Sequence, residues 1–219
     1  YAKRDELVAK TFQEDTNFTL YLVIDASASM GYQGKRASLS KLRYAKMLAA
    51  CFAYLAHRQG DRFGLFAYSD EVQQWIRPLS GSGHLNRVLV SLDALEAKGE
   101  NDHEKAWDKL AGGLPGRSMV VFLSDFLEAE DTLSERLRFS LSARYECLCM
   151  QILDPDEVDL PHEEAVRFAE MEGIREISSA PPAIRKKYQE DMGAFIEDLR
   201  GKLAAVSAEF ESLRSDPEL

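Results

Sequence analysis

Long apolar runs are absent from this sequence of 219 residues. No stretch approaches the roughly 20 apolar residues that a helix needs to cross a bilayer, so we expect no membrane segment within the chain. Its 45% hydrophobic and 29% charged residues are typical of a globular protein that buries a substantial core.

Basic residues are in the minority. The chain has 27 Lys and Arg against 37 Asp and Glu, which gives a formal net charge of -10. Nucleic-acid binding draws most of its affinity from basic side chains that neutralise phosphates, so this balance argues against a nucleic-acid partner. The two short basic clusters, Lys35-Arg36 and residues 185–187, are predicted to be solvated positions on a loop and at a helix start.

Cysteine is also scarce. The three cysteines are Cys51, Cys147 and Cys149, and none of them has the C-x-x-C spacing of a redox or metal-binding pair. An odd number of cysteines inside apolar stretches favours reduced thiols in the core and a cytoplasmic protein.

Continuous apolar runs predict the strands. Runs of this length, bounded by polar residues and separated by helical patterns, indicate a mostly parallel sheet that is covered on both faces. Residues 71–76 follow the second run after a Ser69-Asp70 turn, which predicts one antiparallel strand at the edge of the sheet. The four runs cover residues 18–24, 62–67, 119–123 and 145–153.

Helical patterns fill the gaps between these runs, and the apolar stripe of the last helix is expected to pack on the sheet. Shorter strands are expected at residues 7–12 and 209–214. The predicted helices cover residues 42–56, 85–95, 104–110, 132–143 and 182–207.

The alternation of strands and helices predicts a single doubly wound α/β domain. We expect it to occupy residues 18–219, after an N-terminal extension at residues 1–17. The acidic, interrupted stretch at about 154–179 is interpreted as an insertion that contains a small hairpin.

Oxygen-bearing side chains follow the predicted strands at the edge where open α/β sheets bind their ligands. The first run ends in Asp25, Ser27 and Ser29, at alternate positions that let a carboxylate and two hydroxyls converge. The third run is followed by Ser124-Asp125. An oxygen-only set of this kind suits a hard cation such as Mg²⁺ or Mn²⁺. Neutral hydroxyls leave the ion able to accept a further carboxylate from a partner, which favours adhesion over hydrolysis.

These motifs resemble a known family. D-A-S-A-S-M-G after an apolar strand, with S-D after a later one, is similar to the metal-ion-dependent adhesion site of von Willebrand factor A domains. Further stretches across nearly the whole chain resemble the bacterial "domain of unknown function 58" branch of that fold: T-F-Q-E-D-T-N, L-A-Y-L-A-H-R-Q-G-D-R-F-G-L-F-A, V-V-F-L-S-D-F-L and I-L-D-P-D-E.

The resemblance implies Ser27 and Ser29 as direct metal ligands, with Asp25 and Asp125 acting largely through bound water. The family usually has Gly-x-Thr-Asp at a further position, where this chain has residues 99–102 with Asn101 in place of the threonine. Either the Asn101 amide oxygen or Asp102 is then a candidate ligand. The alternative is a structural domain whose degenerate site no longer holds metal.

The histidines and Asp154 are predicted to have no direct role in the site. His103 is predicted to be a surface histidine at a helix start, and Asp154 is predicted to cap a loop before Pro155. His57, His84 and His162 are scattered without ligand spacing, so no role is assigned to them.

The resemblance implies a non-enzymatic bacterial interaction module in the cytoplasm, with a MoxR-type AAA+ ATPase as its partner. A partner Asp or Glu would complete the coordination of the metal. The sequence lacks a P-loop, a dinucleotide fingerprint and a G-x-S-x-G elbow. The remaining enzymatic alternative is a Mg²⁺-dependent phosphohydrolase that uses Asp25 and Asp125.

Overall fold

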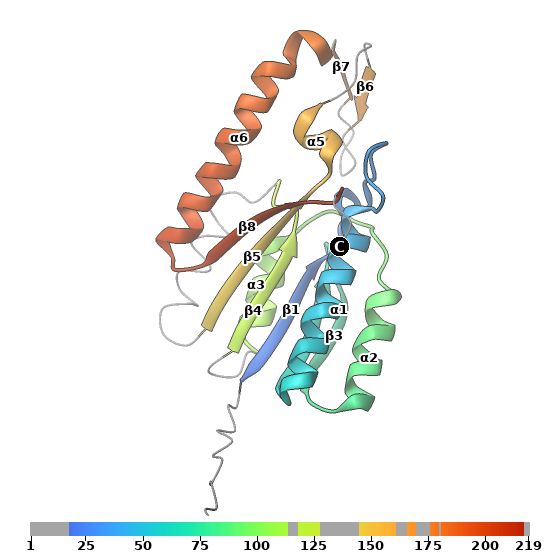
Figure 1. Ribbon diagram of the computed structural model, residues 1–219, viewed down its shortest axis with the longest axis vertical. Coiled ribbons are helices and arrows are strands. Elements are labelled where there is room, and N and C mark those ends of the chain that lie inside the picture. Colours follow the sequence, from blue (N-terminus) through green and yellow to red (C-terminus); the bar gives the residue numbers. More distant parts are fainter. Residues whose placement is uncertain are drawn as a thin grey trace, which may run out of the picture.

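The computed structural model describes residues 18–113, 118–127, 145–160, 166–169, 176–179 and 181–216. A six-stranded sheet has the order β3-β2-β1-β4-β5-β8 (Figure 1). Its neighbouring strands pair in parallel, except for β3, which pairs antiparallel with β2 at one edge. The predicted fold class is therefore confirmed. The strands are β1 (Thr19–Asp25), β2 (Arg62–Tyr68), β3 (Val72–Leu79), β4 (Ser118–Ser124), β5 (Tyr145–Leu153) and β8 (Glu209–Arg214).

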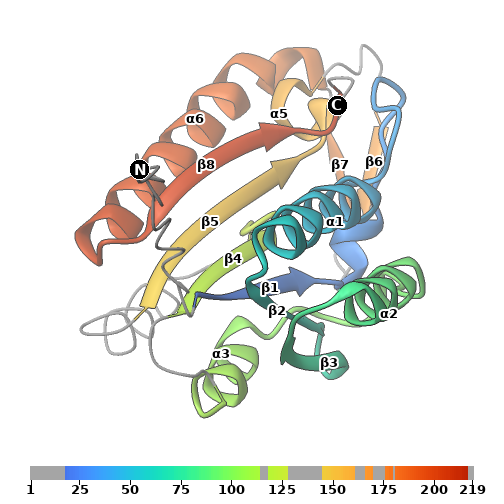
Figure 2. The ribbon, with the colours of Figure 1, turned by 60° about the horizontal axis from the view of Figure 1, so that its bottom comes forward.

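Helices cover both faces of this sheet. On one face, α1 (Lys41–Gln59) and α2 (Ser82–Asp93) pack on alternate residues of β1, such as Leu22. On the other face, α3 (His103–Ala111) and α6 (Pro181–Ala205) pack on the intervening residues, such as Val23 (Figure 2). All seven residues of β1 are buried, as expected for a central parallel strand, and this explains its unbroken apolar run.

The region after β5 contains a helix that was not predicted, α5 (Pro155–Asp159). It is followed by an antiparallel pair, β6 (Val166–Ala169) and β7 (Glu176–Ser179), which confirms the expected hairpin. In Figure 1 these elements lie beyond the end of β5, close to the first half of α6.

The other predicted elements agree with the structure, apart from two that lie outside the described residues, the helix at 132–143 and the strand at 7–12. Cys147 and Cys149 are buried in the core as predicted. Cys51 is exposed, so its assignment to the core was wrong. The core-facing side of α1 carries Ala45, Ala49 and Ala53, and Cys51 lies off this stripe.

The carboxyl ends of the parallel strands meet along one edge. Asp25 pairs with Tyr68 at the ends of β1 and β2, and Ser124 pairs with Gln151 near the ends of β4 and β5. The loops that follow these strands hold the candidate site. In the part of the chain that the structure describes, no helix has the length and apolar character to cross a membrane.

Candidate metal site

The loop after β1 is fixed from two sides. Ala26 N donates to Tyr68 O at 2.7 Å, and Ala28 N donates to Gly99 O at 2.9 Å. Gly99 has φ +75°, and a Cβ there would lie only 2.2 Å from Asp70 Oδ1, so this position requires glycine. The short 3-10 helix η1 (Ala28–Gly31) follows directly. The loop that carries Asn101 is thus held against the loop that carries Ser27 and Ser29.

Asp25 is enclosed by hydrogen-bond donors. Its Oδ1 accepts from Ser27 N at 2.9 Å, and its Oδ2 accepts from Asn101 Nδ2 at 2.8 Å and from Ser124 Oγ at 2.7 Å. Burial, and then the charge of Asp125, raises the pKa of Asp25 to about 7, against the lowering effect of the Ser27 and Ser124 hydrogen bonds. A carboxylate held in this way would support a metal site and would leave direct contact with an ion to its neighbours.

Two hydroxyls and a second carboxylate converge beside Asp25. Ser27 Oγ lies 3.2 Å from Ser29 Oγ, and the Ser29 side chain hydrogen-bonds Asp125. Asp125 Oδ1 accepts from Leu127 N at 3.2 Å. Ser29 and Asn101 are only partly buried, so the cluster reaches the surface.

This donor set fits a divalent metal. Neighbouring ligands of an octahedral Mg²⁺ lie about 2.9 Å apart, close to the separation of the two serine hydroxyls. Among the described residues, no three His, Cys, Asp or Glu side chains are arranged to hold an ion, so the hydroxyls would be essential. Of the predicted ligands, Asp25, Ser27, Ser29, Asn101 and Asp125 come together. Asp102 instead caps α3, with its Oδ1 accepting from Lys105 N at 2.8 Å.

A buried lysine in this site was missed. Lys41, the first residue of α1, places Nζ 2.8 Å from Asp125 Oδ2 and 2.6 Å from Glu157 Oε1. Burial favours the neutral form of all three groups. The opposite charges prevail for Lys41, whose pKa is raised, and for Asp125, whose pKa is lowered, whereas burial prevails for Glu157, whose pKa is raised. The sequence marks Lys41 only as the residue after a helix-capping Ser40.

His103 is buried, so its assignment to the surface was wrong. Its Nδ1 lies 2.5 Å from Tyr68 Oη, its Nε2 lies 3.0 Å from Asn101 Nδ2, and its ring contacts Phe122 and Phe126. Burial lowers the pKa of His103 to about 4, which keeps the ring neutral. The first residue of α3 faces the sheet here, and neither Tyr68 nor Phe122 is near it in sequence.

The loop between η1 and α1 is fastened to α5. Gly34 N donates to Asp154 Oδ2 and Lys35 N to Asp156 Oδ2, both at 2.8 Å. Arg36 is exposed on this loop, as predicted, and its guanidinium also pairs with Asp156 and Asp159. A Cβ on Gly34 would lie 2.5 Å from the carboxylate oxygens of Asp154 and Asp156, so only glycine fits. Asp154 caps the helix α5, where only a capped loop was predicted, and forms a capping box with Glu157.

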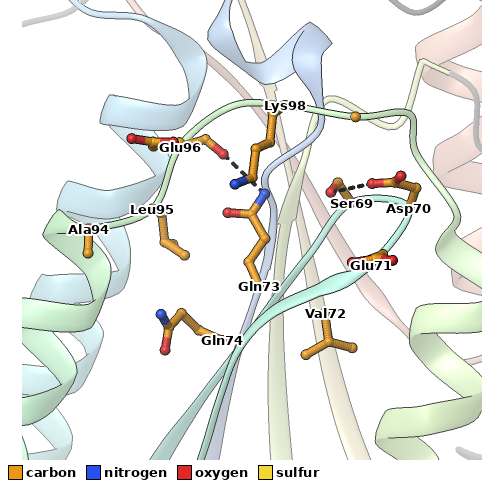
Figure 3. A pocket seen from close by; sticks show the side chains of 11 residues that line it. Ser69, Asp70, Glu71, Val72, Gln73, Gln74, Ala94, Leu95, Glu96 and Lys98 are labelled. Atoms are coloured by element: carbon orange, nitrogen blue, oxygen red, sulfur yellow. Dashed lines mark hydrogen bonds between the residues drawn. The ribbon is translucent and has the colours of Figure 1, made fainter.

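A polar hollow of about 510 Å³ lies behind the metal loop (Figure 3). It lies between the turn that joins β2 to β3 and the segment that leads to Asn101. Gln73 Nε2 donates to Glu96 O at 3.1 Å and to Ala26 O at 3.3 Å, and so ties both walls to the metal loop. The side chain of Gln73 thus helps to hold the metal loop in place.

Sequence comparison finds one family and several relatives. The family described as "Protein of unknown function DUF58" matches residues 1–194. "Uncharacterized protein Rv1480" of Mycobacterium tuberculosis and "Uncharacterized protein Mb1516" of Mycobacterium bovis are each 28% identical over 207 residues. The match covers 92% of this chain and 64% of each relative, so the chain spans about 64% of the length of these proteins.

Solved structures share the fold at low identity. An aerotolerance-related membrane protein from Bacteroides fragilis gives a TM-score of 0.56 at 15% identity, over 90% of this chain and 92% of that one. The conserved hypothetical protein BatB from Bacteroides thetaiotaomicron gives 0.53 at 13% identity, over 86% and 98%. The SpRpn10 VWA domain gives 0.50 at 12% identity, over 92% and 90%. The fold is therefore that of a von Willebrand factor A domain.

Proposed function

The chain belongs to the family described as "Protein of unknown function DUF58", and we propose that it is a non-enzymatic module that binds a protein partner through a divalent metal, Mg²⁺ or Mn²⁺. The observation that carries this proposal is the convergence of the Ser27 and Ser29 hydroxyls, 3.2 Å apart, beside Asp125 at the carboxyl edge of the sheet.

Each residue has a distinct task in this proposal. Ser27 and Ser29 would hold the ion directly, and Asp25 and Asp125 would supply negative charge from behind. Asn101 is anchored by its amide nitrogen to Asp25, which places it at the rim of the site. When bound, the ion would offer a coordination position to an acidic side chain of the partner, because the neutral hydroxyls do not satisfy its charge.

The arrangement around His103 supports a binding role over catalysis. Its two ring nitrogens face Tyr68 and Asn101, so it does not activate Ser27 or Ser29 as a general base would. The partner that we propose is a MoxR-type AAA+ ATPase in the bacterial cytoplasm, which would present an Asp or Glu to the site. The net charge of -10 supports a protein over a nucleic acid as the partner.

Capture of a purified MoxR-type ATPase, with Mn²⁺ and with EDTA, tests the proposal. We expect EDTA to abolish capture, and Ser27→Ala and Asp25→Ala to weaken it by roughly tenfold or more, since changes at metal sites commonly cost that much. Ser82→Ala, an exposed serine at the start of α2, is the matched control and should behave as wild type.

Undiminished capture by both site variants would refute the proposal. Hydrolysis of a generic phosphoester that disappears in Asp25→Ala would instead favour the Mg²⁺-dependent phosphohydrolase.

A further inference from the structure

The ammonium of Lys41 is a permanent cation within the candidate metal site. Its side chain is completely buried, with 0% exposed, and its charge is met by Asp125 at 2.8 Å and Glu157 at 2.6 Å. Lysine is almost never fully buried unless it is paired, so these two contacts account for its position.

The same carboxylate would serve the metal. Asp125 is hydrogen-bonded by Ser29, one of the two hydroxyls that would hold the ion, while its Oδ2 contacts the ammonium of Lys41. Two cations that depend on one carboxylate at such short range repel each other and share its charge. Occupation by an ion would therefore weaken the contact between Lys41 and Asp125.

Glu157 offers the ammonium an alternative position. Its Oε2 accepts from Asp154 N at 2.9 Å in the capping box of α5, while its Oε1 contacts Lys41. Tyr188 Oη donates to the backbone oxygen of Glu157 at 2.7 Å, which fixes α5 further. This carboxylate can keep the ammonium neutralised when Asp125 turns to an ion.

We propose that Lys41 is an internal competitor of the metal, which lowers the affinity of the site by occupying Asp125, and that Glu157 receives the ammonium when the ion binds. This inference rests on the proposed function, because it assumes that the Ser27–Ser29 cluster is a metal site. It makes metal occupancy dependent on a contact between α1 and α5, outside the residues that touch the ion.

Calorimetric titration of Mn²⁺ into the full chain tests this competition. Lys41→Met removes the competitor and should bind Mn²⁺ roughly tenfold tighter or more. Glu157→Gln leaves Asp125 as the sole carboxylate for a buried ammonium, and should bind Mn²⁺ roughly tenfold more weakly. Lys187→Met removes the same charge from an exposed helix position and should match wild type.

The double variant Lys41→Met/Glu157→Gln keeps the test valid if Lys41→Met alone fails to fold. Lys41→Met leaves two carboxylates without their ammonium and is expected to be less stable, whereas the double variant also removes the charge of Glu157. It should fold, and it should bind Mn²⁺ more tightly than Glu157→Gln alone.

Two results would overturn the inference. Equal affinities in folded wild type, Lys41→Met and Glu157→Gln would exclude competition while leaving the metal site in place. Absence of binding in both variants that lack Lys41 would mean that Lys41 orders the site. A different result would refute the proposed function itself: the partner would be captured without Mn²⁺, and Ser27→Ala would capture it as well as wild type does.

Discussion

The side-chain amide of Asn101 lies between Asp25 and His103 and contacts both. Asn101 Nδ2 lies 2.8 Å from Asp25 Oδ2 and 3.0 Å from His103 Nε2. Burial raises the pKa of Asp25 from 3.8 to about 7 and lowers that of His103 from 6.5 to about 4. The same enclosure therefore favours the uncharged form of both groups, and their effects on stability have opposite signs.

We predict that these effects offset each other between pH 4.5 and 6.5. Over that range the unfolded chain binds a proton at His103 that the folded chain lacks, so acidification destabilises the fold. The folded chain holds a proton at Asp25 that the unfolded chain lacks, so acidification stabilises it, and this contribution is lost as pH rises through 7. Each group alone changes the free energy of unfolding by up to about 1.4 kcal/mol per pH unit.

His103→Gln and Asp25→Asn separate the two effects. Relative to wild type, His103→Gln should gain about 2 kcal/mol of stability as pH falls from about 6.5 to 4.5, and Asp25→Asn should lose about as much. Urea unfolding in EDTA, followed by tryptophan fluorescence at each pH, measures the difference. Profiles parallel to wild type in both variants would contradict the assignment.

Spacing along one strand end predicted Asp25, Ser27 and Ser29, and the family resemblance added Asn101 and Asp125, whereas Lys41 was missed. Asp25, Ser27 and Ser29 lie on one short loop, so their spacing alone suggested convergence. Lys41 contacts Asp125 across 84 positions and Glu157 across 116. No local pattern distinguishes a lysine that turns inward from one that faces solvent, and this pairing depends on the packing of α1 against the end of the sheet.

At the scale of elements, the loop that precedes α1 contacts α5, and we expect that this contact can be broken without unfolding the rest of the protein. Asp156 accepts a hydrogen bond from Lys35 N and pairs with Arg36, both contacts to a nearly buried carboxylate. Hydrogen bonds to charged groups contribute about 1.5–3 kcal/mol each. We predict that Asp156→Ala releases this loop and speeds tryptic cleavage after Lys35 and Arg36 by roughly tenfold or more.

Limited proteolysis with mass spectrometry measures this cleavage. Asp191→Ala, which removes an exposed carboxylate paired with Lys187, is the control and should leave the rate unchanged. Cleavage of Asp156→Ala at the wild-type rate would show that other contacts hold the loop.

The elements themselves differ in how far the sequence predicted them. β1, β2, β4 and β5 were predicted because both of their faces are buried, which gives continuous apolar runs. α5 was missed because five residues are too few for a helical period, although its capping box, Asp154-Pro155-Asp156-Glu157, is a recognisable start signal. For Cys51 the error was in the prediction of burial. Its neighbours in sequence are apolar, which suggested a core position, but Cys51 lies on the exposed face of α1.

At the scale of the whole molecule, the fold places the site on a rigid platform. β1 lies between β2 and β4, and its two faces belong to two separate cores, one under α1 and α2 and the other under α3 and α6. Alternating strands and helices predicted this layered arrangement without giving the order of the strands. Because both cores meet at β1, an ion bound at its end should stabilise the described fold as a unit.

We therefore predict that Mn²⁺ raises the thermal midpoint of the whole chain. An ion at about 100 times its Kd adds about 2.7 kcal/mol to the free energy of unfolding. For a chain of this size that corresponds to a rise of about 5–10 °C, measured by calorimetric scanning.

Ser27→Ala is the decisive control for this rise. The net charge of -10 attracts cations to the surface without any site, and Ser27→Ala keeps that charge unchanged. A rise that disappears in Ser27→Ala therefore belongs to the hydroxyl cluster, whereas an equal rise in both proteins would assign the effect to the acidic surface and contradict a specific metal site.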